Sequence, residues 1–156
     1  MTKQDLSKAA TFNLSEHFTL GEMLETRYYT SQEMPEGATL LNLSRLCIEV
    51  LEPLREEVGV PIHVNSGFRS ARVNEYVHGA SNSAHLKGCA ADITFNVEDR
   101  LATLGAAYEQ LKKNPLVDQC IWYKKRSFLH VGIRPHNSAL LPRNQFLVKV
   151  GGSKIN

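Results

Sequence analysis

The chain has 156 residues, a length that suits one domain with a sizeable buried core. Hydrophobic residues account for 42% of the sequence and charged residues for 22%, which excludes a disordered or fibrous chain. The formal net charge is +2 and the basic residues are scattered apart from the triplet at 124–126, so the sequence lacks the sustained basic face of a nucleic-acid-binding protein. We expect a monomeric protein with no nucleic-acid partner.

Residues 1–20 contain no apolar core of about 7 to 15 residues, and no stretch of about 18 apolar residues occurs anywhere in the sequence. These patterns predict neither a signal peptide nor a membrane span, and hence a chain that is cytoplasmic as synthesised. A substrate outside the membrane would then be reached through a holin or after cell lysis. The three cysteines are widely spaced without a CxxC pair, which predicts reduced, buried thiols.

The chain is expected to divide into a short N-terminal segment and one domain. Residues 1–17 are mostly polar and are expected to form a flexible N-terminal segment, whereas residues 18–156 are expected to form a single domain. Thr19 and Glu22 have the spacing of a capping box, in which each side chain bonds to the other residue's backbone N–H. This spacing predicts a short helix that begins just after Thr19.

Helical and alternating patterns follow one another along the rest of the chain. Apolar residues at helical spacing predict the longest helix at residues 38–57, and Pro53 is expected to kink it or to end its regular part. The later elements are expected to be a strand at 62–67, a helix at 70–77, a strand at 90–95, a helix at 101–111, hairpin strands at 119–123 and 128–133, and a last strand at 145–150. The pattern predicts an α+β domain, with a small, mainly antiparallel sheet packed with helices.

Three side chains are candidate metal ligands. His85 and Asp92 lie seven residues apart in a run of small residues, a spacing that suits a loop turning into a strand. His130 stands between Leu129 and Val131 in a strand-like run, so its side chain is expected on the face opposite to its neighbours. Two imidazoles and a carboxylate match the three protein ligands of a catalytic zinc site. On spacing alone, the alternative is equally good: His85 and Asp92 share only a hydrogen bond, and His130 is a core residue.

A resemblance to a known family favours the metal site. The motifs that carry it are Ser66-Gly67-Phe68-Arg69-Ser70, Asn74, Gly79-Ala80, the SxHxxGxAxD pattern at residues 83–92, and Leu129-His130-Val131. Over residues 18–133 the sequence resembles the zinc D-alanyl-D-alanine carboxypeptidases, a family with a hedgehog-like fold that includes phage endolysins. The resemblance implies that His85, Asp92 and His130 bind Zn²⁺. It also implies a metallopeptidase, either carboxypeptidase or endopeptidase, that acts on D-alanine-containing peptidoglycan stem peptides.

The same resemblance assigns roles to two further residues. Arg69 would hold a substrate carboxylate or stabilise the oxyanion, tasks for which a permanently charged, planar guanidinium is suited. Ser83 would contact the substrate or orient the site, and its alternative role is to cap the loop that precedes His85. The basic triplet at residues 124–126 is interpreted as a solvated hairpin end rather than an anion-binding element.

The sequence departs from the family at the catalytic base. Peptide-hydrolysing relatives carry a glutamate a few residues before the last histidine, but residues 121–129 contain no carboxylate, and Tyr123 occupies the expected position. Two substitutes remain: Asp118 as the general base, or Tyr123 as a donor to the oxyanion. Because a positioned base typically contributes about 10²–10⁴-fold, its loss would leave a slow enzyme. The alternatives are an impaired zinc domain that binds cell-wall peptide or a protein partner, and a phage or prophage structural component.

Overall fold

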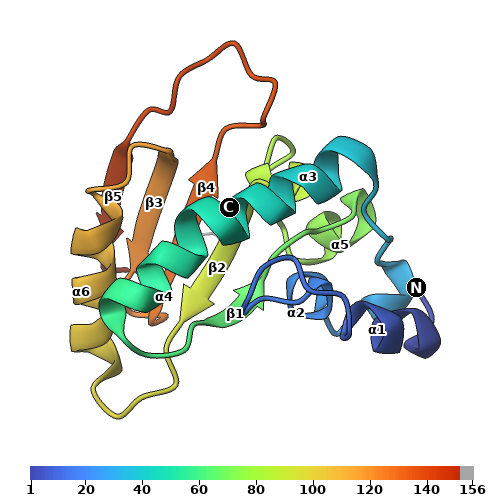
Figure 1. Cartoon of the computed structure of the whole chain (residues 1–156), viewed down its shortest axis with the longest axis horizontal. Helices are drawn as coiled ribbons and strands as arrows, with labels where there is room; N and C mark the ends of the chain where they lie inside the picture. Colours follow the sequence, from blue (N-terminus) through green and yellow to red (C-terminus); the bar gives the residue numbers. More distant parts are fainter. Residues whose placement is uncertain (152–156) are drawn as a thin grey trace.

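The computed structural model describes residues 1–151, which fold around one five-stranded sheet (Figure 1). The strands are β1 (His63–Ser66), β2 (Ala90–Thr94), β3 (Val117–Tyr123), β4 (Phe128–Ile133) and β5 (Gln145–Lys149), and their order across the sheet is β1-β2-β4-β3-β5. Every pairing is antiparallel except that of β5 with β3, which is parallel. The predicted α+β class with a mainly antiparallel sheet is confirmed.

Helices cover one face of this sheet (Figure 1). They are α3 (Gly37–Leu46), a π-helical turn η2 (Cys47–Leu51), α4 (Glu52–Val58) and α6 (Arg100–Leu111). Buried residues at alternate strand positions point toward these helices and join the main hydrophobic core: Ala91, Ile93, Cys120, Leu129 and Val131. The residues between them, which include Asp92 and His130, therefore belong to the opposite face of the sheet.

The π-helical turn has a clear chemical origin in the predicted long helix. Pro53 has no backbone N–H, so the carbonyl of Glu49 cannot accept its usual helical hydrogen bond. Just before the proline, the helical turn contains one extra residue, and the N–H of Glu52 bonds to the carbonyl of Cys47, five residues earlier. The Glu49 carbonyl instead accepts a 2.9 Å hydrogen bond from the Asn114 side chain, which lies beyond the end of α6. Pro53 thus interrupts the helix without ending it.

The N-terminal residues are more regular than the sequence suggested. Within the segment expected to be flexible (1–17), α1 spans Lys3–Ala9 and begins with a capping box between Thr2 and Asp5. The N-terminal ammonium group donates to the carbonyls of Tyr29 and Gln32, at 3.2 and 2.9 Å. These contacts tie the start of the chain to a distant loop, a tertiary restraint that local sequence patterns do not reveal.

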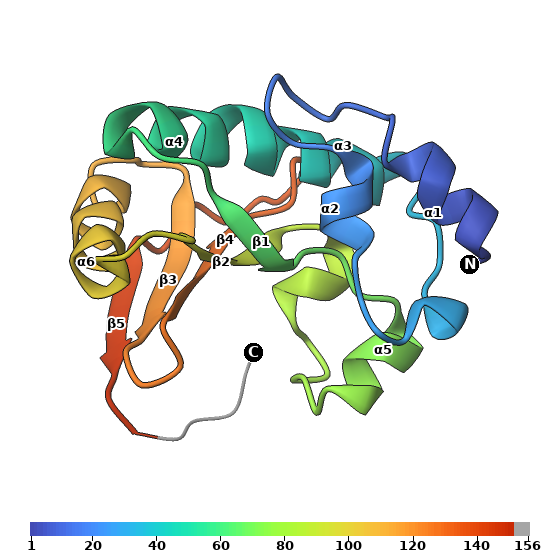
Figure 2. The same cartoon turned by 90° about the horizontal axis from the view of Figure 1, so that it is seen from below.

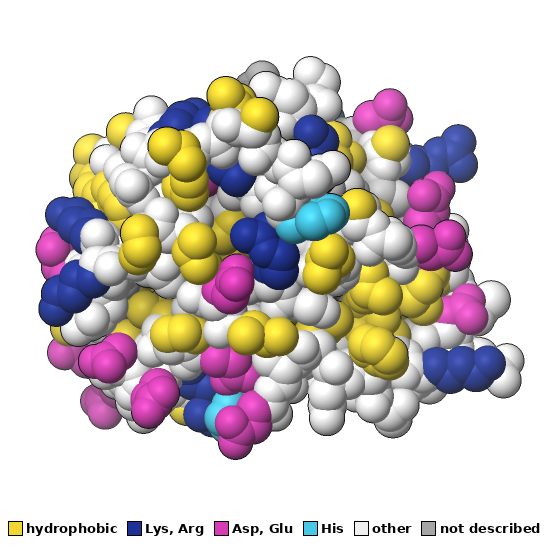
Figure 3. Space-filling view, turned by 45° about the horizontal axis from the view of Figure 1, so that its top comes forward, with side chains coloured by type: hydrophobic (Ala, Val, Ile, Leu, Met, Phe, Trp, Pro, Cys, Tyr) yellow, Lys and Arg dark blue, Asp and Glu magenta, His cyan; other side chains and the backbone are white. Residues whose placement is uncertain are grey.

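Short helices flank the β1 edge of the sheet, with α1, α2 (Leu20–Leu24) and α5 (Ala71–Tyr76) on the side away from α6 (Figure 2). The predicted capping box of α2 is present, since Glu22 accepts from the Thr19 N–H at 2.7 Å and Thr19 accepts from the Glu22 N–H at 3.2 Å. All three cysteines are free and buried, as predicted. Positive and negative side chains are interspersed over the face shown in Figure 3. Among residues 1–151 no helix combines the length and apolar character needed to cross a membrane.

Candidate metal centre

The structure brings His85, Asp92 and His130 together on the face of the sheet opposite the helices. Asp92 lies in the middle of β2, directly across from His130 on β4. Asp92 Oδ1 is 3.2 Å from His85 Nε2 and 3.0 Å from His130 Nδ1, and one ligand atom from each residue lies within 4.8 Å of the others. All three residues are buried. The cluster therefore has the composition and proximity of a three-ligand metal site.

Local backbone geometry explains how His85 reaches this cluster. It lies on a 3₁₀ turn, η3 (Ala84–Lys87), which ends at Gly88 with a left-handed φ of 69°. A side chain at Gly88 would also lie 2.6 Å from the Thr39 carbonyl oxygen. Glycine therefore lets the chain turn tightly against α3 and enter β2 within a few residues.

The ring of His85 is fixed by a second hydrogen bond. Its Nδ1 lies 2.6 Å from the carbonyl oxygen of Gly67, so Nδ1 carries the proton and donates it. Nε2 is then left with its lone pair directed at the site. A side chain at Gly67 would lie 2.6 Å from the Met23 carbonyl oxygen, which explains the glycine there. Gly67 of the SGxRS motif thus provides the carbonyl that orients His85 of the SxHxxGxAxD motif.

The electrostatics of the cluster favour the protonation states that a metal requires. Burial alone would raise the pKa of Asp92, but the adjoining imidazoles of His85 and His130 favour its ionised form and lower this pKa well below the ordinary value. Burial lowers the pKa of His85 and outweighs the attraction of Asp92. At neutral pH we therefore take Asp92 as ionised and His85 as neutral, the forms in which carboxylate and imidazole bind metals.

Arg69 is buried beside the cluster, and three different groups fix its guanidinium. Nε donates to Ser66 Oγ at 3.1 Å, Nη1 to Asn74 Oδ1 at 3.2 Å, and Nη2 to Asp92 Oδ2 at 3.3 Å. One oxygen of Asp92 thus faces Arg69 while the other faces the two histidines. The sequence predicts a substrate role for Arg69 but not this contact with the candidate ligand, because the contact depends on how the segment between β1 and α5 lies beside β2.

Ser83 is buried at the start of η3. Its Oγ accepts a hydrogen bond from the His85 backbone N–H at 3.3 Å, which is the capping geometry considered as its alternative role. Ser83 also lines a cavity together with His130. The residue therefore both shapes the turn that carries His85 and borders the candidate metal centre.

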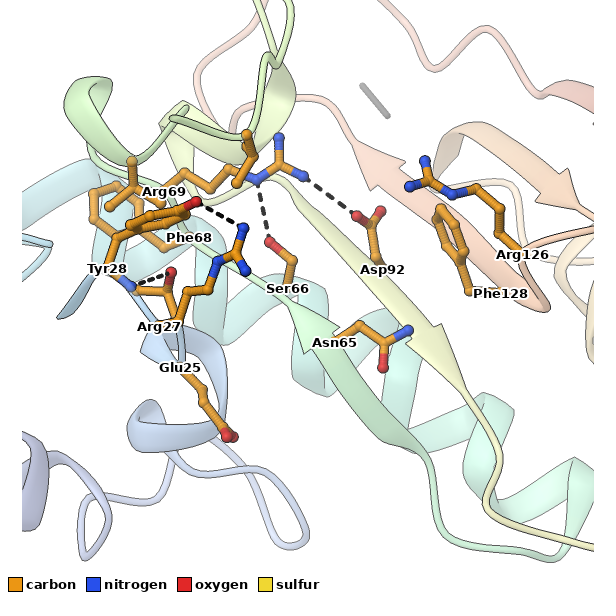
Figure 4. A pocket seen from close by; sticks show the side chains of 13 residues that line it. Glu25, Arg27, Tyr28, Asn65, Ser66, Phe68, Arg69, Asp92, Arg126 and Phe128 are labelled. Atoms are coloured by element: carbon orange, nitrogen blue, oxygen red, sulfur yellow. Dashed lines mark hydrogen bonds and ion pairs between the residues drawn. The ribbon is translucent and has the colours of Figure 1, made fainter. Parts of the chain in front are cut away.

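Two cavities flank the cluster. The first has a volume of about 390 Å³ and contains Arg69 and Asp92 in its wall, together with Tyr28, Phe68 and Phe128 (Figure 4). The second, of about 380 Å³, is more polar and is bordered by Ser83, His130 and residues of the loop at 134–143. A bound peptide in either cavity would lie next to one of the candidate ligands.

Tyr123, the residue in the position expected for the glutamate, lies on the same face of the sheet as His130. Its Cα pairs with that of Phe128 across the hairpin, and the two rings stack with centroids 4.7 Å apart. Only 1% of Tyr123 is exposed, and it interacts electrostatically with Arg69. An aromatic ring thus lies on the site face of the sheet, at the position where the sequence predicts a carboxylate.

Asp118 is held by two arginines. Its Oδ1 accepts from the Arg143 backbone N–H at 2.9 Å and lies 3.0 Å from Arg134 Nε, while its Oδ2 lies 2.9 Å from Arg143 Nη2. Burial would raise the pKa of Asp118, but the hydrogen bonds and charge of Arg143, together with the charge of Arg134, lower it. A carboxylate with a depressed pKa and occupied lone pairs makes a poor general base. The geometry fits instead a clamp that ties the 134–143 loop to β3.

Replacing Asp118 by asparagine distinguishes a structural role, in which Asp118 holds the 134–143 loop to β3, from a role as general base. We expect the free energy of unfolding at pH 7 to fall by about 1–3 kcal/mol, because the charged hydrogen bonds to Arg143 and Arg134 are lost. Since the pKa of Asp118 is depressed in the folded state, this contribution is present at neutral pH and disappears as the pH falls from about 5 toward that pKa. Urea unfolding of wild type and D118N at pH 7 and pH 3 measures the difference. A loss of turnover of about 10²-fold or more with unchanged stability would instead identify Asp118 as the base.

Comparisons with known proteins agree with the geometry. The Peptidase M15 family matches residues 16–132 of the chain. The zinc D-Ala-D-Ala carboxypeptidase of Streptomyces albus G is 52% identical over 78 residues, which cover 49% of this chain and 31% of that relative. The chain thus matches about a third of the length of this curated relative. Because the family match covers most of the chain and includes all three residues of the cluster, the predicted resemblance is confirmed and the chain belongs to the Peptidase M15 family.

Proposed function

We propose that this chain is a zinc metallopeptidase that hydrolyses D-alanine-containing stem peptides of peptidoglycan. The observation that carries the proposal is the convergence of His85, Asp92 and His130, with one potential ligand atom from each within 4.8 Å of the others. The similarity to a zinc D-Ala-D-Ala carboxypeptidase supports both the metal and the substrate. An endolysin role, with delivery through a holin or after lysis, stays a prediction from the sequence.

The donor set fits zinc. Two imidazole nitrogens and one carboxylate oxygen are the protein ligands typical of catalytic zinc sites, which keep a further position open. His85 and Asp92 each have the outer partner that orients such ligands, the Gly67 carbonyl and the Arg69 guanidinium. When bound, zinc supplies Lewis acidity that polarises a carbonyl and acidifies water.

The residues around the cluster suit a peptide substrate. Phe68 and Phe128 give the first cavity apolar walls, which can exclude water and accept a small apolar side chain such as that of alanine. Arg69 keeps a positive charge beside Asp92, and a fixed positive charge can stabilise the negative charge that develops on a scissile carbonyl oxygen. Substrate orientation and oxyanion stabilisation are therefore both available from this chain's own side chains.

The proposal is tested by metal analysis and a release assay on the same preparation. We expect one zinc per chain after purification without added metal, and release of D-alanine from a synthetic pentapeptide ending in D-Ala-D-Ala. Turnover is expected to be slow, since the described site offers no carboxylate placed as a general base. A preparation that contains stoichiometric zinc but releases neither D-alanine nor cross-link peptide from cell walls would refute the peptidase.

A second candidate is a zinc domain that binds stem peptide without cleaving it. The specific observation in its favour is that Tyr123 is buried, since the resemblance predicts the catalytic glutamate at this position. This candidate predicts that zinc-loaded protein cosediments with peptidoglycan and that Arg69→Ala abolishes the binding, while no D-alanine appears over days. The release assay and the sedimentation assay together separate the two candidates.

A further inference from the structure

The segment between β1 and α5 is buried although it belongs to neither element. Residues 67–70 follow the last residue of β1 and directly precede the first residue of α5. Phe68, Arg69 and Ser70 are at most 8% exposed. Buried backbone polar groups need hydrogen-bond partners, and a segment outside a sheet or helix does not obtain them from a regular ladder. The conformation of residues 67–70 therefore depends on individual contacts.

The same segment supports two of the three candidate metal ligands. The Gly67 carbonyl accepts from His85 Nδ1, and the Arg69 guanidinium donates to Asp92 Oδ2. The backbone N–H of Arg69 also donates to the His85 carbonyl at 3.1 Å. A displacement of residues 67–70 would thus disturb the outer partners of His85 and Asp92 together.

Gln32 holds this segment with its side-chain amide. The residue is only 2% exposed. Its Nε2 donates to the Phe68 carbonyl at 3.0 Å and to the Leu24 carbonyl at 3.2 Å, while its Oε1 accepts from the Ser70 N–H at 2.9 Å. One amide group therefore bonds to the backbone on both sides of Arg69.

The Gln32 amide fits this place in one orientation only. Two carbonyl oxygens require its NH₂ group and the Ser70 N–H requires its oxygen, so the reversed amide would set oxygen against oxygen. The backbone is fixed as well, because the Gln32 carbonyl accepts from the N-terminal ammonium group at 2.9 Å. The carbonyl of the preceding Ser31 accepts from Ser70 Oγ at 2.8 Å. Gln32 thus links the N-terminal part of the chain to the segment that supports the ligands.

We propose that Gln32 is a positioning residue for the metal centre. It acts through the two outer partners of the ligands, the Gly67 carbonyl and the Arg69 guanidinium. The inference rests on the metal site of the proposed function but not on its substrate. Loss of an outer partner typically costs about 10–100-fold in metal affinity or activity. Gln32 lies one contact further from the ligands, so we expect an effect toward the lower end of that range.

The test compares two side-chain amides that are changed in the same way. Gln32→Glu replaces the NH₂ group by an oxygen that faces two carbonyls, and Gln32→Met keeps the length of the side chain without an amide. Asn114→Asp is the matched control, because the Asn114 amide also joins two backbone groups, the Glu49 carbonyl at 2.9 Å and the Leu116 N–H at 3.0 Å. Glu49 belongs to the π-helical turn on the face of the sheet opposite the metal centre.

Zinc affinity of the full-length protein is measured by competition with a chromophoric chelator, and stability of the metal-free protein by urea unfolding. We expect Q32E and Q32M to weaken zinc binding about tenfold and N114D to change it less than about twofold. All three variants should lower the urea midpoint, so a loss of stability alone would not explain the difference. The absorption spectrum of Co²⁺-loaded protein should shift in the Gln32 variants and match wild type in N114D, since only the former change the ligand geometry.

Zinc affinities of both Gln32 variants equal to that of wild type would overturn the inference, as would an equal loss of affinity in N114D. If Q32E does not fold, Q32M decides the matter. D-alanine release from the pentapeptide is measured on the same samples, and zinc affinity decides the inference whether or not release occurs. If wild type binds no zinc, the metal site of the proposed function fails and the inference fails with it. If wild type binds zinc and releases D-alanine while the Gln32 variants bind zinc as tightly, the inference alone fails.

Discussion

Replacing His130 by alanine is expected to abolish stoichiometric zinc binding and turnover. His130 is one of only three clustered candidate ligands in the described part of the chain, and its Nδ1 faces Asp92 Oδ1 at 3.0 Å. Loss of an outer partner of a metal ligand typically costs about 10–100-fold in metal affinity or activity, so loss of a ligand itself should cost more. The measurement is zinc content after dialysis, together with D-alanine release.

Thermal unfolding provides a second readout for this variant. Ligand at about 100 times its dissociation constant stabilises a folded protein by about 2.7 kcal/mol, so zinc should raise the melting temperature of wild type. The same addition should leave that of H130A unchanged. His63→Ala is the matched control, since His63 is an exposed histidine on β1 of the same sheet. Retention of one zinc per chain by H130A would show that the metal, if present, binds elsewhere.

Replacing Tyr123 by glutamate is expected to raise turnover by at least tenfold. Tyr123 lies two residues beyond Ile121, which pairs directly with His130, so both Tyr123 and His130 project from the same face of the sheet. A carboxylate in this position would lie near Arg69, whose charge offsets part of the cost of burial. A well-placed general base contributes about 10²–10⁴-fold, which sets the upper limit of the gain.

Tyr123→Gln is the control for this prediction. Glutamine has nearly the same size as glutamate and also removes the aromatic stack with Phe128, but it cannot act as a base at neutral pH. We expect kcat to rise in Y123E alone, with zinc content unchanged in both variants. Equal kcat values for Y123E and Y123Q would exclude this position as the site of the missing base.

The cluster could be predicted from the sequence because short-range geometry makes each ligand's placement plausible and the family resemblance links the three positions. Gly88 and the small residues near it let His85 and Asp92 lie on a turn and the strand that follows it, as the seven-residue spacing suggested. His130 was assigned to the site face from the alternation of a strand with its neighbours Leu129 and Val131. The strand register that brings it opposite Asp92 is long-range, but the family motif already linked the two positions.

The features that sequence analysis did not predict depend on segments without periodicity. The ion pairs of Asp118 with Arg134 and Arg143 could not be predicted, since both arginines come from the loop between β4 and β5. The same loop carries the chain back so that β5 can pair in parallel with β3.

The direct pairing of Asp92 with His130 has a consequence for how the sheet assembles. A slip of one residue between β2 and β4 would send one of the two side chains into the hydrophobic layer, because successive side chains point to opposite faces. Only strands in the native register can bind a metal ion with both residues, so metal binding would stabilise this register relative to a shifted one. A cation bound by Asp92 and His130 would therefore stabilise the native register of β2 and β4 in addition to any part it takes in catalysis.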